Sequence, residues 1–158
     1  MYTREEIIAA IRDAEARLDR LEPVIREHLQ QHLPTGTWTV HDAVCHLAAD
    51  SNAVPRFLDR IEKQRTGQPV RPAGFNMDAH NEANIARRRG LSLDEVLHEV
   101  HAGFANDIAQ VQALPSDLLA SDVPNFRGEL TPASDQIRFT AAGHPNLHLD
   151  DIEAALKA

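Results

Sequence analysis

The stretch that decides the fold is Ser92–Leu114, SLDEVLHEVHAGFANDIAQVQAL. Ser92 is suited to cap a helix, and Glu95 stands at the third helical position, which is the pattern of a capping box. Apolar side chains then recur every three or four residues, the period of a helix with one buried face. They are Leu93, Val96, Leu97, Val100, Phe104, Ile108 and Val111. The stretch therefore predicts a long amphipathic helix.

Two segments before this helix repeat its pattern. The first is predicted to be helical over Thr3–Leu33, with Pro23 able to bend it. The second is predicted over Val40–Arg65, because Thr39 with Asp42 three residues later forms another capping pattern. Pro55 is expected to kink or interrupt this second helix. The segment TGQPVRPAG that follows holds two prolines and two glycines and is predicted to be a loop.

After the helix that starts at Ser92, the segment LPSDLLASDVPNFRGEL is predicted to be irregular. A fourth helix is expected to start at Thr131 and Pro132, as a cap followed by proline at the first helical position, and to run toward Lys157. No alternating apolar run is long enough to argue for a sheet. We therefore predict an all-α protein, a single domain over residues 1–158 built as an up-and-down four-helix bundle.

Composition narrows the classes of partner. The chain has 16 Lys and Arg against 24 Asp and Glu, a formal net charge of −8. Because this charge repels phosphate backbones and anionic lipids, we expect no nucleic acid and no membrane partner. The chain also lacks a long apolar run and a signal-peptide pattern at its start, so we expect a cytoplasmic protein. Cys45 is the single cysteine, interpreted as a buried apolar residue, so any metal must be held by histidine and carboxylate.

The nine histidines include three pairs at helical spacing, so spacing alone does not select a site. His28 with His32 is interpreted as a solvated helix end, and His98 with His101 as residues bordering an apolar stripe. Taken alone, the pair His144 and His148 also favours polar residues on a last helix over metal ligands. His46 favours a metal site, because a histidine within the second helix faces the other helices of a bundle. A buried imidazole there needs a partner. Three imidazoles that converge across the core would bind a metal and leave a position open.

The sequence resembles the DinB/YfiT-like superfamily, which includes the N-terminal domains of mycothiol-dependent maleylpyruvate isomerases. GTWTVHDAVCHLAAD is similar to the motif that opens the second helix there, and HNEANIARRRGLSLDEVLHEV to the segment before and into the third. GHPNLHLDDIEAAL resembles the closing HxxxHxxxI motif. The resemblance implies a DinB-like bundle with a divalent metal bound by His46, His144 and His148. Pro145 departs from the pattern, and we expect it to kink the helix at His144 or to begin a short final helix.

The resemblance further implies a metal-dependent enzyme that activates a low-molecular-weight thiol and acts as a thiol S-transferase or isomerase. Its partners would be a small-molecule thiol and an electrophile, and the protein would be a homodimer. Zn or Ni suits three imidazoles, with Fe a further candidate. Two alternatives stay open: a dimeric bundle that binds metal or ligand without turnover, and a hydrolase that uses metal-bound water.

Four further residues are candidates near such a site. Asp50, one turn after His46, is either a solvated carboxylate or a group that orients an imidazole. Asn81, Arg87 and Arg88 are candidate cofactor-binding residues, suited to the carboxylates of a thiol cofactor, although a solvated run of charges fits the arginines as well.

Overall fold

The protein is described by a computed structural model that covers residues 1–157 and is mostly helical. Its helices are α1 (Arg4–Glu27), α2 (Val40–Asp50), α3 (Ala53–Arg65), α4 (Met77–Ala86), α5 (Leu93–Ala113), α6 (Ser116–Ala120), α7 (Ala133–Arg138), the π-helical turn η1 (Phe139–Gly143) and α8 (His144–Leu156). The strands β1 (Asp122–Pro124) and β2 (Leu130–Pro132) form an antiparallel hairpin. The predicted mostly helical class is confirmed, but the described chain forms more helices than the four that were predicted.

Local capping starts the helices where the sequence predicts. Thr39 accepts a hydrogen bond from the Asp42 amide, and the Asp42 carboxylate accepts one from the Thr39 amide. Ser92 and Glu95 form the same reciprocal pair at the start of α5. These contacts satisfy amide groups that a helix cannot satisfy by itself, so residues three apart in the sequence are enough to determine both starting points.

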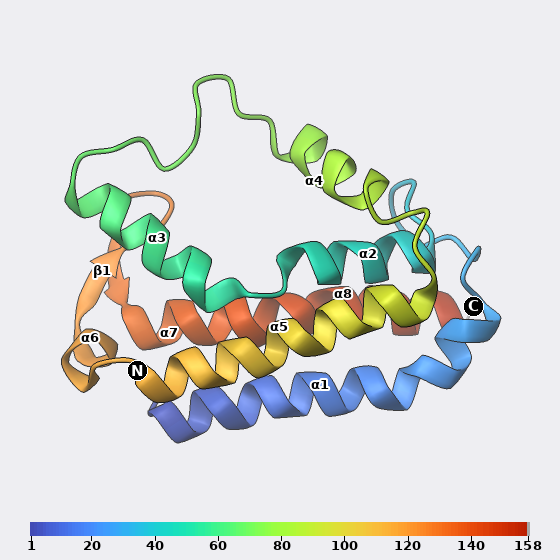
Figure 1. Ribbon diagram of the computed structural model, residues 1–158, viewed down its shortest axis with the longest axis horizontal. Coiled ribbons are helices and arrows are strands. Elements are labelled where there is room, and N and C mark those ends of the chain that lie inside the picture. Colours follow the sequence, from blue (N-terminus) through green and yellow to red (C-terminus); the bar gives the residue numbers. More distant parts are fainter. Residues whose placement is uncertain (158) are drawn as a thin grey trace.

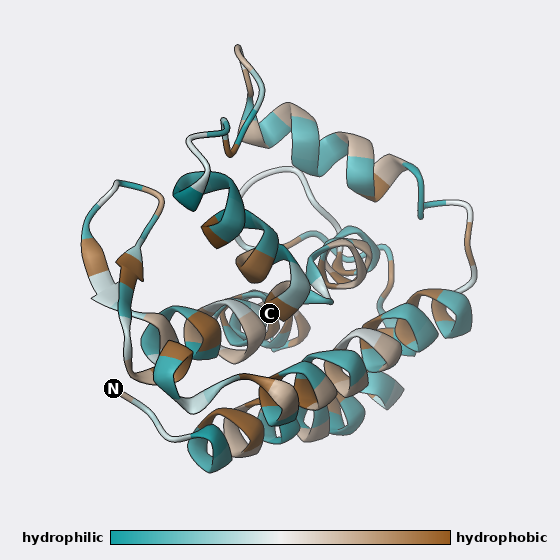
Figure 2. Ribbon diagram, turned by 60° about the vertical axis from the view of Figure 1, so that its left-hand side comes forward, coloured by the Kyte–Doolittle hydropathy of each residue, from teal (hydrophilic) through white to brown (hydrophobic). Residues whose placement is uncertain are grey.

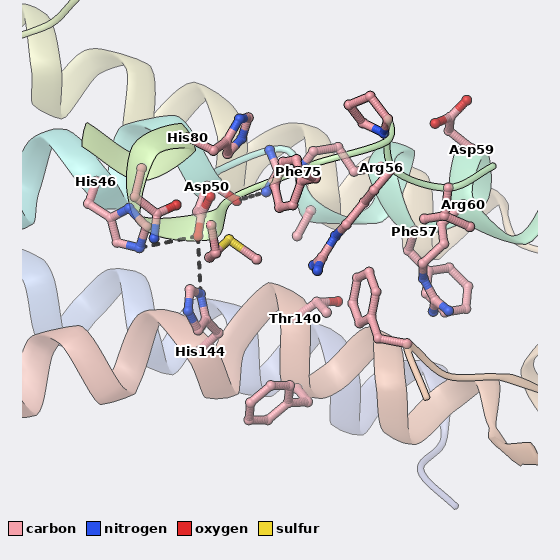
Figure 3. Close-up of a pocket in the computed structure, with 18 residues that line it drawn as sticks. His46, Asp50, Arg56, Phe57, Asp59, Arg60, Phe75, His80, Thr140 and His144 are labelled. Atoms are coloured by element: carbon pink, nitrogen blue, oxygen red, sulfur yellow. Dashed lines mark hydrogen bonds and ion pairs between the residues drawn. The ribbon is translucent and has the colours of Figure 1, made fainter. Parts of the chain in front are cut away.

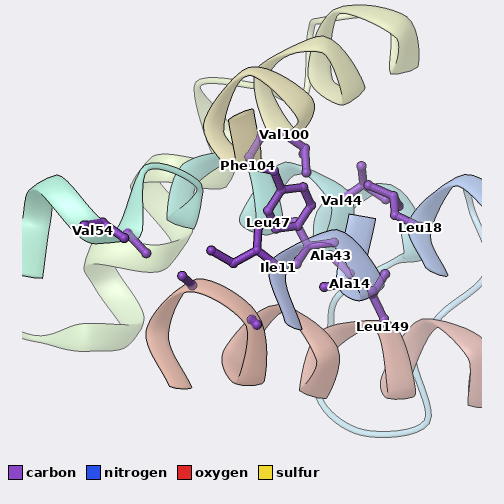
Figure 4. Close-up of a cluster of buried hydrophobic side chains, with 14 of the residues drawn as sticks. Ile11, Ala14, Leu18, Ala43, Val44, Leu47, Val54, Val100, Phe104 and Leu149 are labelled. Carbon is purple, nitrogen blue, oxygen red and sulfur yellow. The ribbon is translucent and has the colours of Figure 1, made fainter. Parts of the chain in front are cut away.

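Helices α1, α2, α5 and α8 pack around one apolar core. In Figure 1, α1 and α5 lie side by side, and α7, η1 and α8 form one continuous rod behind them. Figure 4 shows side chains of all four helices meeting in the core. The labelled buried residues include Ile11, Ala14 and Leu18 of α1, Ala43, Val44 and Leu47 of α2, Val100 and Phe104 of α5, and Leu149 of α8. The core holds α2 and α8 against each other, which positions the histidines that they carry.

The first helix ends earlier than predicted, at Glu27 rather than Leu33. The chain after it folds back on itself: the Leu33 amide donates to the Trp38 carbonyl, and the Val40 amide donates to the Gln31 carbonyl. Gly36, at φ +78°, permits the reversal between them. Apolar periodicity continues past Glu27, but these cross-turn bonds replace the helical ones.

The predicted second helix is divided into α2 and α3 at Ser51 and Asn52. The division precedes Pro55, which was expected to cause it and instead lies in the first turn of α3, where its missing amide costs no hydrogen bond. Asn52 adopts a left-handed conformation with φ +63°. The break fits closely against α5, since a Cβ added at Gly103 would lie 2.2 Å from the Ser51 Cβ. Only glycine permits this approach.

Helix α4 was not predicted from its sequence. It buries only Ile85, and Figure 2 shows hydrophilic residues alternating along it with apolar ones. It lies over α2 (Figure 1), held by the Arg89 guanidinium, whose Nε donates to Asp42 Oδ1 at 2.8 Å and whose Nη1 donates to Glu82 Oε1 at 2.6 Å. A helix anchored mainly by ion pairs gives a weak apolar period, so periodicity does not detect it.

The segment before the last rod also differs from its prediction. The stretch expected to be irregular contains α6, β1 and the first residue of β2. Thr131 was expected to cap the last helix but belongs to β2, and Pro132 occupies the cap position before Ala133. Strands of three residues are too short to show an alternating pattern.

Candidate metal centre and pocket

Three histidines from two helices meet at one point. His46 lies in the middle of α2 and is 2% exposed, while His144 and His148 lie on the first two turns of α8. Each offers one ring nitrogen, and these three atoms all lie within 4.8 Å of one another. The Nε2 atoms of His144 and His148 are 3.2 Å apart. The residues singled out as metal ligands are therefore brought together by the packing of α2 against α8.

Pro145 lies in the first turn of α8, so of the two expectations the start of a final helix is the one that the structure matches. His144, the residue before it, keeps helical angles of φ −64° and ψ −46°. The preceding turn is wider than an α-turn, since the His144 amide donates to the Phe139 carbonyl five residues back. A proline ring normally clashes with the carbonyl four residues earlier, and the widened turn relieves that crowding. The rod continues into α8, so His144 and His148 keep the spacing of one helical turn.

Asp50 lies between two of the histidines. Its Oδ2 is 3.4 Å from His46 Nε2 and 3.4 Å from His144 Nδ1 (Figure 3). The Trp38 ring packs on the same cluster, with its centroid 4.9 Å from that of His46. Of the two interpretations left open by the sequence, the structure favours a carboxylate that contacts the imidazoles over a solvated one, although its side chain remains 32% exposed.

Burial keeps the imidazoles in the form that binds metals. Burial, with the charges of His46 and His144, lowers the pKa of His148 to about 4. Burial likewise lowers the pKa of His46, with Asp50 acting in the opposite direction. His46 Nδ1 is buried and has no hydrogen-bond partner among the described residues. Neutral imidazoles with free lone pairs are what a divalent ion requires.

The lowered pKa of His148 predicts that the stability of the metal-free protein depends on pH. Between the ordinary pKa of 6.5 and the folded value of about 4, the unfolded chain binds more protons at His148 than the folded chain. The free energy of unfolding is therefore expected to fall as pH falls through this window, by about 2 kcal/mol after allowance for solvent screening. Urea unfolding with a chelator present, at several pH values from about 7.5 to 4, measures it. In the variant His148→Gln the free energy of unfolding should depend less on pH. The same pH dependence as in wild type would contradict the assignment of this effect to His148.

A cavity of about 580 Å³ opens beside the histidines, a size typical of small-molecule sites. Figure 3 shows His46, Asp50 and His144 at one end and Phe57 and Arg60 at the other. Its walls are formed mainly by α3, the loop before α4, the start of α4 and the hairpin tip; they include Val70, Pro72, Phe75, Met77, Phe126 and Phe139. The site therefore consists of a polar cluster at the end of a largely apolar pocket.

The structure separates the candidate cofactor-binding residues. Asn81 of α4 lines the pocket. Arg87 and Arg88 do not, and Arg88 Nε instead donates to Glu99 Oε2 of α5 at 2.7 Å. The role of Arg87 and Arg88 in binding a cofactor stays a prediction that their position outside this pocket does not support. The arginines that line the pocket are Arg56, Arg60 and Arg71, which are not consecutive in the sequence and were not candidates from it.

The other polar candidates lie outside the cluster. His101 contacts Glu15 on α1, with Nδ1 and Oε1 3.0 Å apart. His28 is half-buried at the end of α1, where its Nδ1 lies 2.9 Å from the Val24 carbonyl. Cys45 is buried as expected, and burial raises the pKa of its thiol to about 11. A thiol with such a pKa is a poor nucleophile and a poor metal ligand at neutral pH.

Several solved structures share this fold. The colibactin self-resistance protein ClbS, solved in complex with double-stranded DNA, is 15% identical with a TM-score of 0.73, over 98% of this chain and 96% of that one. DfsB, described as a sibling lethal factor precursor, is 18% identical with a TM-score of 0.70, over 97% of this chain and 95% of that one. The mycothiol-dependent maleylpyruvate isomerase is 16% identical with a TM-score of 0.69. This alignment covers 96% of the chain but only 61% of the isomerase. No curated protein matches the sequence.

The exclusion of nucleic acid as a partner was wrong. ClbS has the same fold and was solved in complex with double-stranded DNA. A net charge of −8 averages over the whole chain, whereas contact with phosphates depends on local groups of arginine and lysine. Within the described residues, no helix is both long and apolar enough to cross a membrane.

The family assignment rests on a match along the chain rather than on a single motif. The family model of the mycothiol maleylpyruvate isomerase N-terminal domain matches residues 9–144. That range includes α2 with His46, the pocket walls and the first residue of α8. The fold of the maleylpyruvate isomerase agrees with the match. The chain therefore belongs to the mycothiol maleylpyruvate isomerase N-terminal domain family.

Proposed function

We propose that this protein is a metal-dependent enzyme that activates a low-molecular-weight thiol for transfer to, or isomerisation of, a small electrophile. The observation that carries the proposal is the set of His46, His144 and His148 nitrogens within 4.8 Å of one another at the end of a cavity. Three protein ligands leave a coordination position for water or substrate, as in catalytic zinc sites. The family match supports a thiol as the co-substrate.

The residues present fit a divalent ion. Two of the imidazoles have a lowered pKa and are neutral at pH 7. The Nε2 atoms of His144 and His148 lie 3.2 Å apart, a separation at which both nitrogens can reach one ion. Imidazole suits Zn and Ni, with Fe also compatible. When bound, such an ion lowers the pKa of a coordinated thiol or water and so supplies a nucleophile at neutral pH.

The surrounding residues orient the histidines and restrict water. Asp50 contacts His46 and His144 at 3.4 Å and so favours one orientation of each ring. The Trp38 ring packs against the His46 ring, with their centroids 4.9 Å apart. Phe139 and Met77 line the cavity wall, while Thr140 and Asn81 offer polar atoms to a substrate. The chain thus holds the reacting groups in a partly dry pocket, where charge interactions are stronger than in water.

The test combines metal content with a thiol assay. We expect purified wild-type protein to bind about one divalent metal per chain, by elemental analysis. With metal, it should accelerate the attack of glutathione, cysteine or mycothiol on 1-chloro-2,4-dinitrobenzene, in which sulfur bonds to the ring carbon, chloride leaves and the thiol proton goes to solvent. Rate increases that need both metal and thiol support the proposal.

Other outcomes contradict it in distinguishable ways. Metal-dependent cleavage of p-nitrophenyl acetate without thiol would favour the hydrolase, in which bound water is the nucleophile. Bound metal without turnover of any tested substrate would favour a binding bundle. Failure to take up added Zn or Ni would remove the metal-dependent enzyme altogether. The homodimer stays a prediction, which light scattering checks.

A further inference from the structure

The end of the pocket away from the histidines carries a buried positive charge without an acidic partner. Arg60 of α3 is 5% exposed. Its guanidinium donates to the Pro124 carbonyl at 2.6 Å, to Gln136 Oε1 at 2.6 Å and to Gln64 Oε1 at 3.2 Å. All three acceptors are neutral, and no carboxylate within residues 1–157 contacts this guanidinium. A buried charge is costly unless it is paired, so the position is suited to an anion from outside the chain.

A second arginine, Arg71, contacts the same aromatic ring as Arg60. The Phe126 ring at the hairpin tip has its centroid 4.6 Å from the Arg60 guanidinium and 4.8 Å from the Arg71 guanidinium. Arg71 also lies 4.8 Å from the centre of the Phe75 ring. Arg71 thus contacts two aromatic rings, and no described residue forms a hydrogen bond or ion pair with its guanidinium. Its donors are available to a ligand.

The carboxylates that line the pocket do not offset these charges. Asp59 is paired with Lys63, with Nζ 2.6 Å from Oδ2. Asp50 lies at the opposite end, against the histidines (Figure 3). The end formed by Arg60, Phe126 and Arg71 is therefore positive, although the whole chain carries −8. Because Arg60 is buried, it attracts an anion more strongly than an arginine surrounded by water would.

We propose that Arg60, Phe126 and Arg71 form an anion-binding subsite, and that the substrate is an elongated molecule with an apolar or aromatic body and a terminal anionic group. The anionic group binds at the arginines, the body lies along the apolar walls, and the reacting atom reaches the histidines. The placement of the reacting atom rests on the proposed function above. The binding of the anion does not, because no metal is needed for it.

The experiment compares charged and uncharged probes of the same shape. Binding of 2-naphthoate and of 2-naphthamide is measured by titration calorimetry on metal-free protein with a chelator. The titrations are made at about pH 8, well above the ordinary pKa of histidine. We expect the carboxylate to bind about tenfold more tightly than the amide, equivalent to about 1.4 kcal/mol. Naphthyl phosphate in a parallel titration shows whether the subsite prefers carboxylate or phosphate.

Substitution at Arg71 tests the location. In Arg71→Gln the preference for the anion should fall to within about twofold of the amide, because the free donors and the charge are gone. Arg87→Gln is the matched control, since Arg87 is an arginine outside the pocket lining, and it should keep the wild-type preference. Arg60 is less suitable for substitution, because its hydrogen bonds also hold the hairpin to α3.

The outcomes separate this proposal from the metal-dependent function. Equal binding of naphthoate and naphthamide by wild type, or an unchanged preference in Arg71→Gln, would overturn the anion subsite even if the protein binds metal. An anion preference that depends on Arg71 would support it even if the protein binds none. Arg71-dependent binding of a short DNA duplex, with no preference between the naphthyl probes, would instead assign these arginines to nucleic acid and overturn the small-molecule ligand.

Discussion

The variant His148→Ala is expected to bind zinc at least about 100-fold more weakly than wild type. Zinc sites with four protein ligands contribute roughly 10–16 kcal/mol, or about 3 kcal/mol per ligand, which corresponds to a factor on this order. His148 Nε2 lies 3.2 Å from His144 Nε2, so its removal leaves a cluster of two imidazoles. His46→Ala should have an effect of the same size, because α2 contributes no other histidine to the cluster.

Competition with a chromophoric chelator measures these affinities, with folding checked by circular dichroism. His80→Ala provides the control: His80 also lines the cavity but contacts Asn84 and lies outside the cluster. It should bind zinc as wild type does. Equal zinc affinity in His148→Ala and wild type, in folded protein, would show that the metal is held elsewhere and would remove the basis of the proposed function.

The variant Asp107→Ala is expected to lower the free energy of unfolding by about 3 to 4 kcal/mol. The Asp107 carboxylate on α5 accepts the Ala53 amide at Oδ2 and the Val54 amide at Oδ1, both at 2.9 Å. These are the first two amides of α3, and no residue of α3's own cap satisfies them. Each buried amide left without a partner costs about 1 to 3 kcal/mol, and alanine leaves two. Urea unfolding of the two proteins measures the difference.

Two further variants make this test specific. Asp107→Asn keeps one carbonyl oxygen as acceptor and should lose roughly half as much stability. Asn106→Ala removes a neighbouring, exposed contact, the 2.7 Å bond to Asn52 Oδ1, and should cost less than about 1 kcal/mol. If Asp107→Ala and Asn106→Ala were equally mild, Asp107 would not be the group that stabilises the start of α3.

The site was predictable to the extent that its signals are local. His46 follows the capping pair Thr39 and Asp42, which determines where α2 starts and therefore where its histidine lies along the helix. His144 and His148 are one helical turn apart, so they share a face whenever that segment is helical. The sequence did not show that the turn before Pro145 widens and keeps the helix intact. That outcome depends on the packing of the whole rod against its neighbours, which no local pattern encodes.

The sequence by itself determined that the chain is helical, where α2 and α5 begin, and which histidines share a helical face. Those features depend on residues a few positions apart, through capping bonds and apolar period. Only the tertiary structure decided that the second helix breaks at Asn52, that Asp50 touches two histidines, and that Arg60 and Arg71 rather than Arg87 and Arg88 line the pocket. Each of these depends on contacts between segments far apart in the chain, such as Asp107 with the start of α3. Such contacts exist only once the helices have packed.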